Sequence, residues 1–287
     1  MKQLLILSGK GGTGKTTIAS AFIKLSSTKV YADCDVDAPN LHLIMNHSND
    51  PERRNYYGLP KAEINQETCI NCGMCKANCR FDAIELDDNQ FNINEYACEG
   101  CGVCEYICPV NAITLKPDVA GELMLYKDKS LFSTAKLKMG RGTSGKLVTE
   151  VKKQLKTDEI TTDIAIIDGS PGIGCPVIAS LSGVDMVLIV AEPSLSGISD
   201  MERIVKTANS FQTKIGICIN KYDTNMDNTR TIEEYCKEMK LPFLGKIPFD
   251  TDAVKAINQG KSIVDIDCRA GGVIQEIYKR TTKELLN

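Results

Sequence analysis

The sequence predicts an α/β fold in which a doubly wound, mostly parallel sheet is interrupted by a small inserted domain. Short apolar runs of strand length alternate with amphipathic helical segments, a pattern typical of a parallel sheet covered by helices. A glycine-rich loop follows the first such run, and a cysteine-rich repeat occupies the middle of the chain. We therefore expect one discontinuous domain, residues 1–59 and 118–287, and an inserted α+β domain at residues 60–117.

The elements of the larger domain follow from the period of the apolar residues, which is two in strands and three to four in helices. Strands are expected at residues 3–7, 29–32, 164–167, 186–190, 214–219 and 243–246. Helices are expected to begin at Lys15, Gly174, Ser199, Thr229, Thr251 and Gly271. Residues 121–139 predict a hairpin and residues 146–156 a helix. The polar stretch HSNDPERRNYYGLP, residues 47–60, reads as a linker into the insert, and Pro117 marks its end.

Composition limits the classes of function. The 287 residues are 43% hydrophobic, which is enough for a large core. A net charge of -3 gives no general attraction to nucleic acid, so no nucleic-acid partner is expected. No apolar run approaches the ~18 residues of a membrane span, and we expect a cytoplasmic protein. In a reducing compartment the 13 cysteines are expected to be metal ligands or free thiols.

The loop after the first strand, SGKGGTGKTT, fits the phosphate-binding pattern G-x-x-x-x-G-K-[ST] in its required place between a strand and a helix. Its backbone N–H groups and the helix dipole attract phosphate. Lys15 is expected to contact the β- and γ-phosphates, and Thr16 to hold Mg²⁺. A glycine-rich turn without a ligand is the alternative, which the full match disfavours. The expected nucleotide-binding residues of the loop are Gly9, Lys10, Gly11, Gly12, Thr13, Gly14, Lys15, Thr16 and Thr17.

The loop contains a second lysine, Lys10, in the arrangement K-G-G-x-G-K-[ST]. With this signature the chain resembles the deviant Walker A ATPases of the MinD/ParA type. The resemblance implies a P-loop ATPase that dimerises with ATP, and in which Lys10 reaches the phosphates of the other subunit like an arginine finger. A solvated loop lysine is the alternative. The catalytic residues implied in this way are Lys10, Lys15 and Asp35.

Two further stretches resemble the nucleotide-sensing switches of that family. YADCDVDAPNL is similar to the first switch, which implies that Asp35 positions the attacking water, with Asp33 and Asn40 beside it. IAIIDGSPGIG is similar to the Walker B strand and the second switch. This implies that Asp168 acts on Mg²⁺ through water and that Gly172 turns its N–H toward the γ-phosphate.

The nucleotide base has its own expected residues. ICINKYD ends a strand with Asn220, the position that reads adenine in the family, and IPFD is expected to complete the pocket with Pro248 and Asp250. Each stretch alone is an ordinary turn at a strand end. Their order and spacing carry the resemblance, which covers nearly all of the chain outside the insert.

The repeat holds two cysteine runs. CINCGMCKANCRFDAIEL, which begins at Cys69, and CEGCGVCEYICPVNAITL, which begins at Cys98, share one pattern, which indicates two copies of one unit. Each run is C-x2-C-x2-C-x3-C, as in bacterial ferredoxins, where the fourth cysteine ligates the other cluster. Zinc held by two C-x2-C pairs is the alternative. The expected ligands are Cys69, Cys72, Cys75 and Cys108 for one [4Fe-4S] cluster, and Cys98, Cys101, Cys104 and Cys79 for the second.

The two runs differ after their fourth cysteine, where Pro109 follows Cys108 but Arg80 follows Cys79. Because cluster potential responds to charge and solvent exposure, we expect two different midpoint potentials.

Cys175 lies seven residues after Asp168, the interval that separates the corresponding aspartate from a bridging-cluster cysteine in dinitrogenase reductase. No cysteine between Cys108 and Cys175 could supply the second ligand of such a bridge. Cys175 is therefore a candidate ligand or exchangeable thiol, and a small buried residue is the alternative.

Together these features resemble MinD-superfamily ATPases with an inserted ferredoxin domain. The function expected is ATP hydrolysis that controls a homodimer and, through it, electron transfer by two [4Fe-4S] clusters. ATP, Mg²⁺ and the clusters are the expected cofactors. The expected partner is a redox or cofactor-carrying protein, akin to the nitrogenase-cofactor-binding small proteins. Two alternatives remain: an ATPase that assembles or carries iron-sulfur or metal cofactors, and a MinD-like positioning ATPase.

Overall fold

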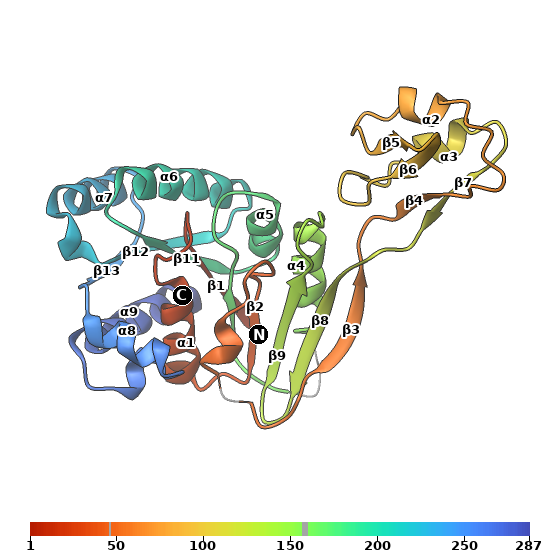
Figure 1. Cartoon of the computed structure of the whole chain (residues 1–287). Helices are drawn as coiled ribbons and strands as arrows, with labels where there is room; N and C mark the ends of the chain where they lie inside the picture. Colours follow the sequence, from red (N-terminus) through yellow and green to blue (C-terminus); the bar gives the residue numbers. More distant parts are fainter. Residues whose placement is uncertain (46, 157–159) are drawn as a thin grey trace. The chain divides into compact units, whose positions relative to one another are not determined.

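One large sheet organises the chain in the computed structural model, which describes residues 1–45, 47–156 and 160–287 (Figure 1). Within this described part, nine strands pair in the order β13-β12-β11-β1-β10-β2-β9-β8-β3. The pairs from β13 to β9 are all parallel, and β8 and β3 continue the sheet beyond β9. The strands are β1 (Lys2–Leu7), β2 (Val30–Asp33), β3 (Glu52–Tyr57), β8 (Val119–Lys127), β9 (Leu131–Leu137), β10 (Ile164–Asp168), β11 (Met186–Ala191), β12 (Lys214–Asn220) and β13 (Phe243–Ile247).

Helices cover both faces of the sheet (Figure 1). On one face α1 (Lys15–Ser26) and α9 (Arg269–Leu286) pack against the central strands, with α8 (Thr251–Asn258) beside them. On the other face lie α4 (Ser144–Lys153), α5 (Cys175–Leu181), α6 (Leu195–Ser210) and α7 (Met226–Glu238). The doubly wound, mostly parallel α/β fold predicted from the sequence is thereby confirmed.

The predicted strands lie within one residue of those observed, and the predicted hairpin is β8 and β9. Helices α4, α6, α7 and α9 begin two to four residues earlier than predicted. In α6 and α7 a polar side chain caps the helix ahead of its first apolar residue. The side chain of Ser194 accepts a hydrogen bond from the N–H of Gly197 at the start of α6, and Asn225 caps α7. The prediction of a linker at residues 47–60 is wrong for the part that forms β3. This is an edge strand in which only Tyr56 is buried, so no apolar run in the sequence indicates it.

The chain divides into two compact units. The larger unit comprises residues 1–53, 123–136 and 144–287, and the smaller unit residues 54–122 and 137–143. Boundaries at residues 60 and 117 stay a prediction. The smaller unit contains two antiparallel pairs, β4 (Lys61–Ile64) with β7 (Ile113–Lys116) and β5 (Ile84–Asp87) with β6 (Gln90–Ile93). Its helices are α2 (Met74–Ala77) and α3 (Val103–Ile107).

The sequence repeat is also a repeat of backbone conformation. Equivalent positions of the two copies share positive φ angles, which residues other than glycine adopt only in special turns. The pairs are Asn71 (53°) with Gly100 (62°), Gly73 (76°) with Gly102 (78°), and Asp82 (50°) with Asn111 (51°).

No helix in the described residues is both long and apolar enough to cross a membrane.

Candidate functional site

The phosphate-binding loop joins β1 to α1 at the carboxyl edge of the parallel strands. Gly12 and Gly14 have φ angles of 78° and 89°, which glycine adopts without strain. A Cβ atom on Gly14 would lie 2.3 Å from Nδ2 of Asn220, and one on Gly9 would lie 2.2 Å from Cβ of Asp200. The loop therefore requires glycine for both conformation and close packing.

Lys15 begins α1, and its Nζ lies 2.5 Å from Oδ1 of Asp168 at the end of β10. The two side chains are 6% and 0% exposed. Burial by itself lowers the pKa of Lys15, but the carboxylates of Asp168, Asp33 and Asp35 outweigh it and raise this pKa above its usual value. Lys15 therefore stays protonated, as contact with phosphate oxygens requires.

Two buried oxygens of this site, Oδ2 of Asp168 and Oγ1 of Thr13, have no hydrogen-bond partner in the described part of the chain. Buried polar atoms are almost always paired, so these two fit a bound ligand. The cavity over the loop is lined by Thr16 and Asp35, among others. Carboxylate and hydroxyl oxygens suit Mg²⁺, so Thr16 and Asp168 fit the metal of a magnesium nucleotide.

Asp33 organises the loop that follows β2. Its carboxylate accepts hydrogen bonds from the N–H groups of Asp35 (3.0 Å), Asn40 (2.9 Å) and Leu41 (3.0 Å). Burial and the nearby Asp168 raise the pKa of Asp33 to about 7. Asp35 and Asn40 line the cavity, and burial raises the pKa of Asp35 as well. Asp33 thus holds the loop in shape while Asp35 is presented to the cavity.

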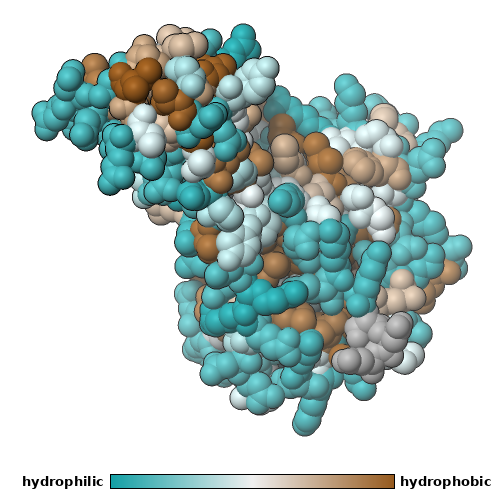
Figure 2. Space-filling view, turned by 90° about the vertical axis from the view of Figure 1, so that its right-hand side faces the viewer, coloured by the Kyte–Doolittle hydropathy of each residue, from teal (hydrophilic) through white to brown (hydrophobic). Residues whose placement is uncertain are grey.

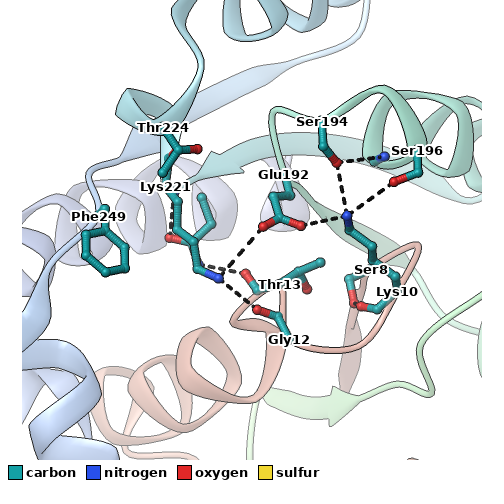
Figure 3. Close-up of polar contacts among 12 residues, drawn as sticks. Ser8, Lys10, Gly12, Thr13, Glu192, Ser194, Ser196, Lys221, Thr224 and Phe249 are labelled. Atoms are coloured by element: carbon teal, nitrogen blue, oxygen red, sulfur yellow. Dashed lines mark hydrogen bonds and ion pairs between the residues drawn. The ribbon is translucent and has the colours of Figure 1, made fainter.

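Lys10 is held by its own chain through the loop between β11 and α6 and through the first turn of α6 (Figure 3). Its Nζ lies 3.0 Å from Oε2 of Glu192 and donates hydrogen bonds to Oγ of Ser194 (3.0 Å) and Ser196 (3.3 Å). The Lys10 side chain is 36% exposed, so it is reachable from solvent. Its role toward a second subunit stays a prediction.

A second cavity adjoins the loop where the nucleotide base is expected. Asn220 donates from Nδ2 to the carbonyl oxygen of Thr13 (2.7 Å), and Lys221 donates from Nζ to that of Gly12 (3.0 Å), which ties the end of β12 to the loop. The lining includes Asn220, Lys221, Ile247, Pro248, Phe249, Asp250, Ala253, Val254 and Ile257. This mixture of apolar surface and a few polar groups suits a purine base.

Two of the expected nucleotide contacts are engaged elsewhere in this structure. The carboxylate of Asp250 accepts N–H bonds from Asp252 (2.9 Å) and Ala270 (3.1 Å), which lower its pKa and cap α8. The N–H of Gly172 donates to the carbonyl oxygen of Ser8 at 3.0 Å.

The eight cysteines of the repeat surround two separate cavities in the smaller unit. Each cavity takes three cysteines from one run and the fourth from the other run. One is lined by Cys69, Cys72, Cys75 and Cys108, and the other by Cys79, Cys98, Cys101 and Cys104. Four cysteines around one cavity match in number and kind the ligands that a [4Fe-4S] cluster requires. No group of three or more His, Cys, Asp or Glu side chains in the described residues is arranged to hold a single metal ion.

The cavities are formed in an apolar setting. Phe91 packs in the core of the smaller unit and lines the cavity of Cys69, and Ala62, Ala83 and Ile84 line that of Cys98. Hydrophobic side chains also reach the surface of this unit (Figure 2). Exposed examples on the cavity rims are Ile70, Met74, Phe81, Val103 and Val110.

The remaining cysteines differ in exposure. Cys34, Cys218 and Cys236 are buried, and burial raises their thiol pKa values to about 12, 12 and 11, so they are inert. Cys175 is exposed at the first position of α5. Its backbone packs against Gly145, where a Cβ atom would lie 3.1 Å from the carbonyl oxygen of Cys175.

Residues 4–263 match the family model described as the CobQ/CobB/MinD/ParA nucleotide binding domain. The chain belongs to this family.

The similarity to relatives of this MinD/ParA-like ATPase family member covers nearly the whole chain. An uncharacterised protein of Methanocaldococcus jannaschii is 35% identical over 285 residues, which are 97% of this chain and 95% of the relative. The cell division ATPase MinD of Pyrococcus furiosus superposes with a TM-score of 0.58 at 17% identity, over 98% of each chain. MinD of Pyrococcus horikoshii, solved with Mg-ADP, gives 0.58 at 18% identity, over 98% of this chain and 96% of that one. These structural likenesses show the fold.

Sequence reasoning missed several residues of this family member's site. Lys10 is held by Glu192, Ser194 and Ser196, which lie about 180 residues further along the chain, after β11 and at the start of α6. No local pattern predicts such a contact. Lys221 follows Asn220 directly and could have been found by asking which cation reaches the loop carbonyls. The bonds to Asp33 depend on the folded turn of residues 35–41.

Proposed function

We propose that this chain is an ATP-hydrolysing iron-sulfur protein, in which a nucleotide-controlled homodimer governs electron transfer through two [4Fe-4S] clusters to a partner metalloprotein. The observation that carries the proposal is that one chain combines a MinD/ParA-type nucleotide site with two cavities of four thiols each. The family supports the ATPase. Support for the clusters comes from the cysteines of this chain alone.

In the nucleotide half, Lys15 binds the phosphates after exchanging its ion pair with Asp168 for them, and Thr16 and Asp168 then face Mg²⁺. Asp35 orients the attacking water from the turn that Asp33 holds. Lys10 is available to a second subunit once it leaves Glu192 and the two serines. The charge it adds across the dimer would stabilise the transition state.

In the smaller unit, the crossed arrangement makes each cavity depend on both runs, since Cys108 and Cys79 exchange places. The N–H of Ala112 donates to Sγ of Cys108 at 3.2 Å, a bond of the kind that orients a sulfur ligand. Bound clusters supply one-electron redox chemistry. The thiols of Cys72 and Cys101 belong to exposed residues, which leaves each cavity close to the surface that a redox partner would approach.

Anaerobic purification with iron and acid-labile sulfide analysis tests the proposal. We expect about eight iron and eight sulfide per chain, and about half of each in Cys75→Ala or in Cys104→Ala. Cys236→Ala, a buried cysteine of the larger unit, is the control and should keep both clusters. Zinc in place of iron, or iron content indifferent to Cys75 and Cys104, would remove the cluster half of the proposal.

A MinD-like positioning ATPase is the second candidate, and the whole-length match to MinD structures favours it. The two candidates separate when reduction of acceptor proteins is followed with and without ATP. Electron transfer that depends on ATP supports the redox function. An iron-free ATPase that instead redistributes on a surface in response to ATP supports the second candidate.

A further inference from the structure

The chain returns from the smaller unit to the larger one through residues 137–143, which we call the return segment. It begins at the end of β9 and leads directly into α4 at Ser144. Although it stands between two elements of the larger unit, the segment belongs to the smaller unit. Within that unit Tyr56 donates to the carbonyl oxygen and to Oγ1 of Thr143, at 3.2 and 3.0 Å, and Arg141 makes the ionic contacts of the segment.

Arg141 is fastened to the smaller unit by every part of its guanidinium group. Nη2 lies 2.7 Å from Oε2 of Glu95, and Nη1 donates to the carbonyl oxygen of Glu95 at 3.1 Å. Nε and Nη2 lie 3.0 and 3.1 Å from the two carboxylate oxygens of Asp118, and the group lies over the ring of Tyr96. The Arg141 side chain is only 9% exposed. The pair with Asp118 is bidentate and largely buried, and pairs of this kind fix geometry. The Glu95 side chain is 55% exposed, so its turn is held as well by the bond to its carbonyl oxygen and by the contact with Tyr96.

The residues that Arg141 holds stand immediately before a cavity cysteine. Asn94 accepts the N–H of Tyr96 on its side chain (3.1 Å) and that of Cys98 on its carbonyl oxygen (3.0 Å). Lys61 bonds the carbonyl oxygen of Cys98. Residues 94–98 are therefore one hydrogen-bonded turn, and a displacement of Glu95 is passed to Cys98.

The other half of the repeat offers an internal comparison. Gln66 occupies the position in the first copy that Glu95 occupies in the second, and it precedes Cys69 in a turn of the same kind. Its Nε2 donates to the carbonyl oxygen of Phe91 at 2.8 Å, within the core of the smaller unit. The turn of Cys69 is thus anchored locally, whereas the turn of Cys98 is anchored to the return segment.

In the larger unit, α4 and α5 are joined at both ends. Gly145 fits closely against the backbone of Cys175 at the start of α5. At the far end, Nζ of Lys152 donates to the carbonyl oxygens of Ser180 and Ser182, both at 2.6 Å. Helix α5 itself follows the loop of residues 169–174, whose first residue comes directly after Asp168.

We propose that the return segment transmits the nucleotide state to the Cys98 cavity and not to the Cys69 cavity, with Arg141 as the positioning residue. When nucleotide displaces the loop of residues 169–174, α5 and α4 move as one body. Two residues separate Arg141 from α4, so the displacement reaches Glu95 and the turn of residues 94–98. The assignment of the cavity as a cluster site rests on the proposed function, whereas the mechanical link does not. The link is a continuous path of covalent bonds, hydrogen bonds and ion pairs, the kind of physical path through which coupling between two sites can pass.

Hydrogen exchange of the full-length, anaerobically purified protein tests the link, with Mg-ADP compared to a non-hydrolysable Mg-ATP analogue. We expect exchange in residues 95–98 to change by about threefold or more between the two nucleotides, and residues 66–69 to stay unchanged. In Arg141→Met the change at residues 95–98 should disappear while nucleotide affinity is retained. Arg230→Met, which removes an exposed arginine of α7, should behave like the unaltered protein.

Glu95→Gln provides a milder second variant, because it installs the residue that the other half of the repeat carries. It should weaken the response without unfolding the smaller unit. A response at residues 95–98 that survives both substitutions, or equal responses at both turns, would overturn the link. Iron analysis of the same samples separates the two proposals. If a chain without iron still changes its hydrogen exchange at residues 95–98 with nucleotide, the link is supported and the proposed clusters are contradicted. In iron-loaded protein, a nucleotide-dependent EPR change of one cluster that is lost in Arg141→Met is a further expected result.

Discussion

The two lysines of the phosphate-binding loop have different surroundings, so their substitution by alanine is expected to have different effects. Lys15 is buried against Asp168, whereas Lys10 is half-exposed against Glu192. Lys10→Ala should leave ATP affinity within about threefold but lower hydrolysis about 10³-fold and abolish ATP-dependent dimerisation, because its charge acts in the transition state. Steady-state hydrolysis, nucleotide titration and light scattering measure the three effects, and Lys237→Ala on the surface of α7 is the control. Normal turnover of the Lys10 variant would show that the trans role is wrong.

Lys15→Ala should impair binding itself. It also leaves the Asp168 carboxylate buried without a counter-charge, which costs about 3–5 kcal/mol of unfolding free energy. Chemical denaturation without nucleotide measures this cost. Equal stability of the two alanine variants would contradict it.

Asp33 gives the nucleotide-free protein a specific pH dependence. Its pKa, raised to about 7 by burial and by Asp168, lies above the ~4 of an aspartate in the unfolded chain. Between these pH values the folded protein holds a proton that the unfolded chain has released, so the unfolding free energy falls as pH rises. Asp33→Asn cannot titrate and loses part of its N–H bonding, worth about 1–3 kcal/mol. The stability difference between wild type and Asp33→Asn should therefore be larger at pH 5 than at pH 8; a constant difference would rule out this pKa.

At the scale of elements, Lys152 joins α4 to the carboxyl end of α5. Lys152→Met leaves the carbonyl oxygens of Ala179, Ser180 and Ser182 without their donor, and should cost about 1–3 kcal/mol in urea unfolding at pH 7. Lys153→Met, one residue on and 61% exposed, should stay within about 0.5 kcal/mol.

Burial lowers the pKa of Lys152 to about 8, so between pH 8 and ~10.5 the folded protein gives up a proton that the unfolded chain keeps. The unfolding free energy of wild type, relative to that of Lys152→Met, should therefore rise between these two pH values. A difference that does not change with pH would contradict this.

The elements that could be predicted are those whose signal is local. The strands β1 and β10 read as apolar runs, and the cysteine runs read as fixed spacings, because each needs only neighbours in the sequence. Strand β3 was not predicted, because an edge strand buries few side chains and therefore shows no apolar pattern in the sequence. The contacts of Arg141 could not be predicted, because its partners Glu95 and Asp118 lie in other segments of the sequence and only the fold brings them together.

At the scale of the whole molecule, the two cavities are each lined by four cysteines but differ in the charge of their other lining residues. Glu99 lines the Cys98 cavity, and its repeat equivalent in the Cys69 cavity is Ile70. Arg80 also follows Cys79, a member of the Cys98 set. Redox titration with EPR should resolve two midpoint potentials, and Glu99→Gln should raise only one of them, because a carboxylate opposes added negative charge. Indistinguishable midpoints, or a shift of both, would contradict this asymmetry.

The two units have separate hydrophobic cores, one built from residues such as Phe22 and Ile166 and the other from residues such as Ile84 and Phe91. Units with their own cores keep their own stability, so loss of one ligand set should not propagate into the other core. The double variant Cys75→Ala, Cys104→Ala should therefore lack iron yet bind ATP with an affinity within about twofold of wild type and dimerise with it. Isothermal titration and light scattering on the same preparation measure both. Loss of ATP binding would instead show that folding of the larger unit depends on the clusters, and that the nucleotide and cysteine sites form one cooperative unit.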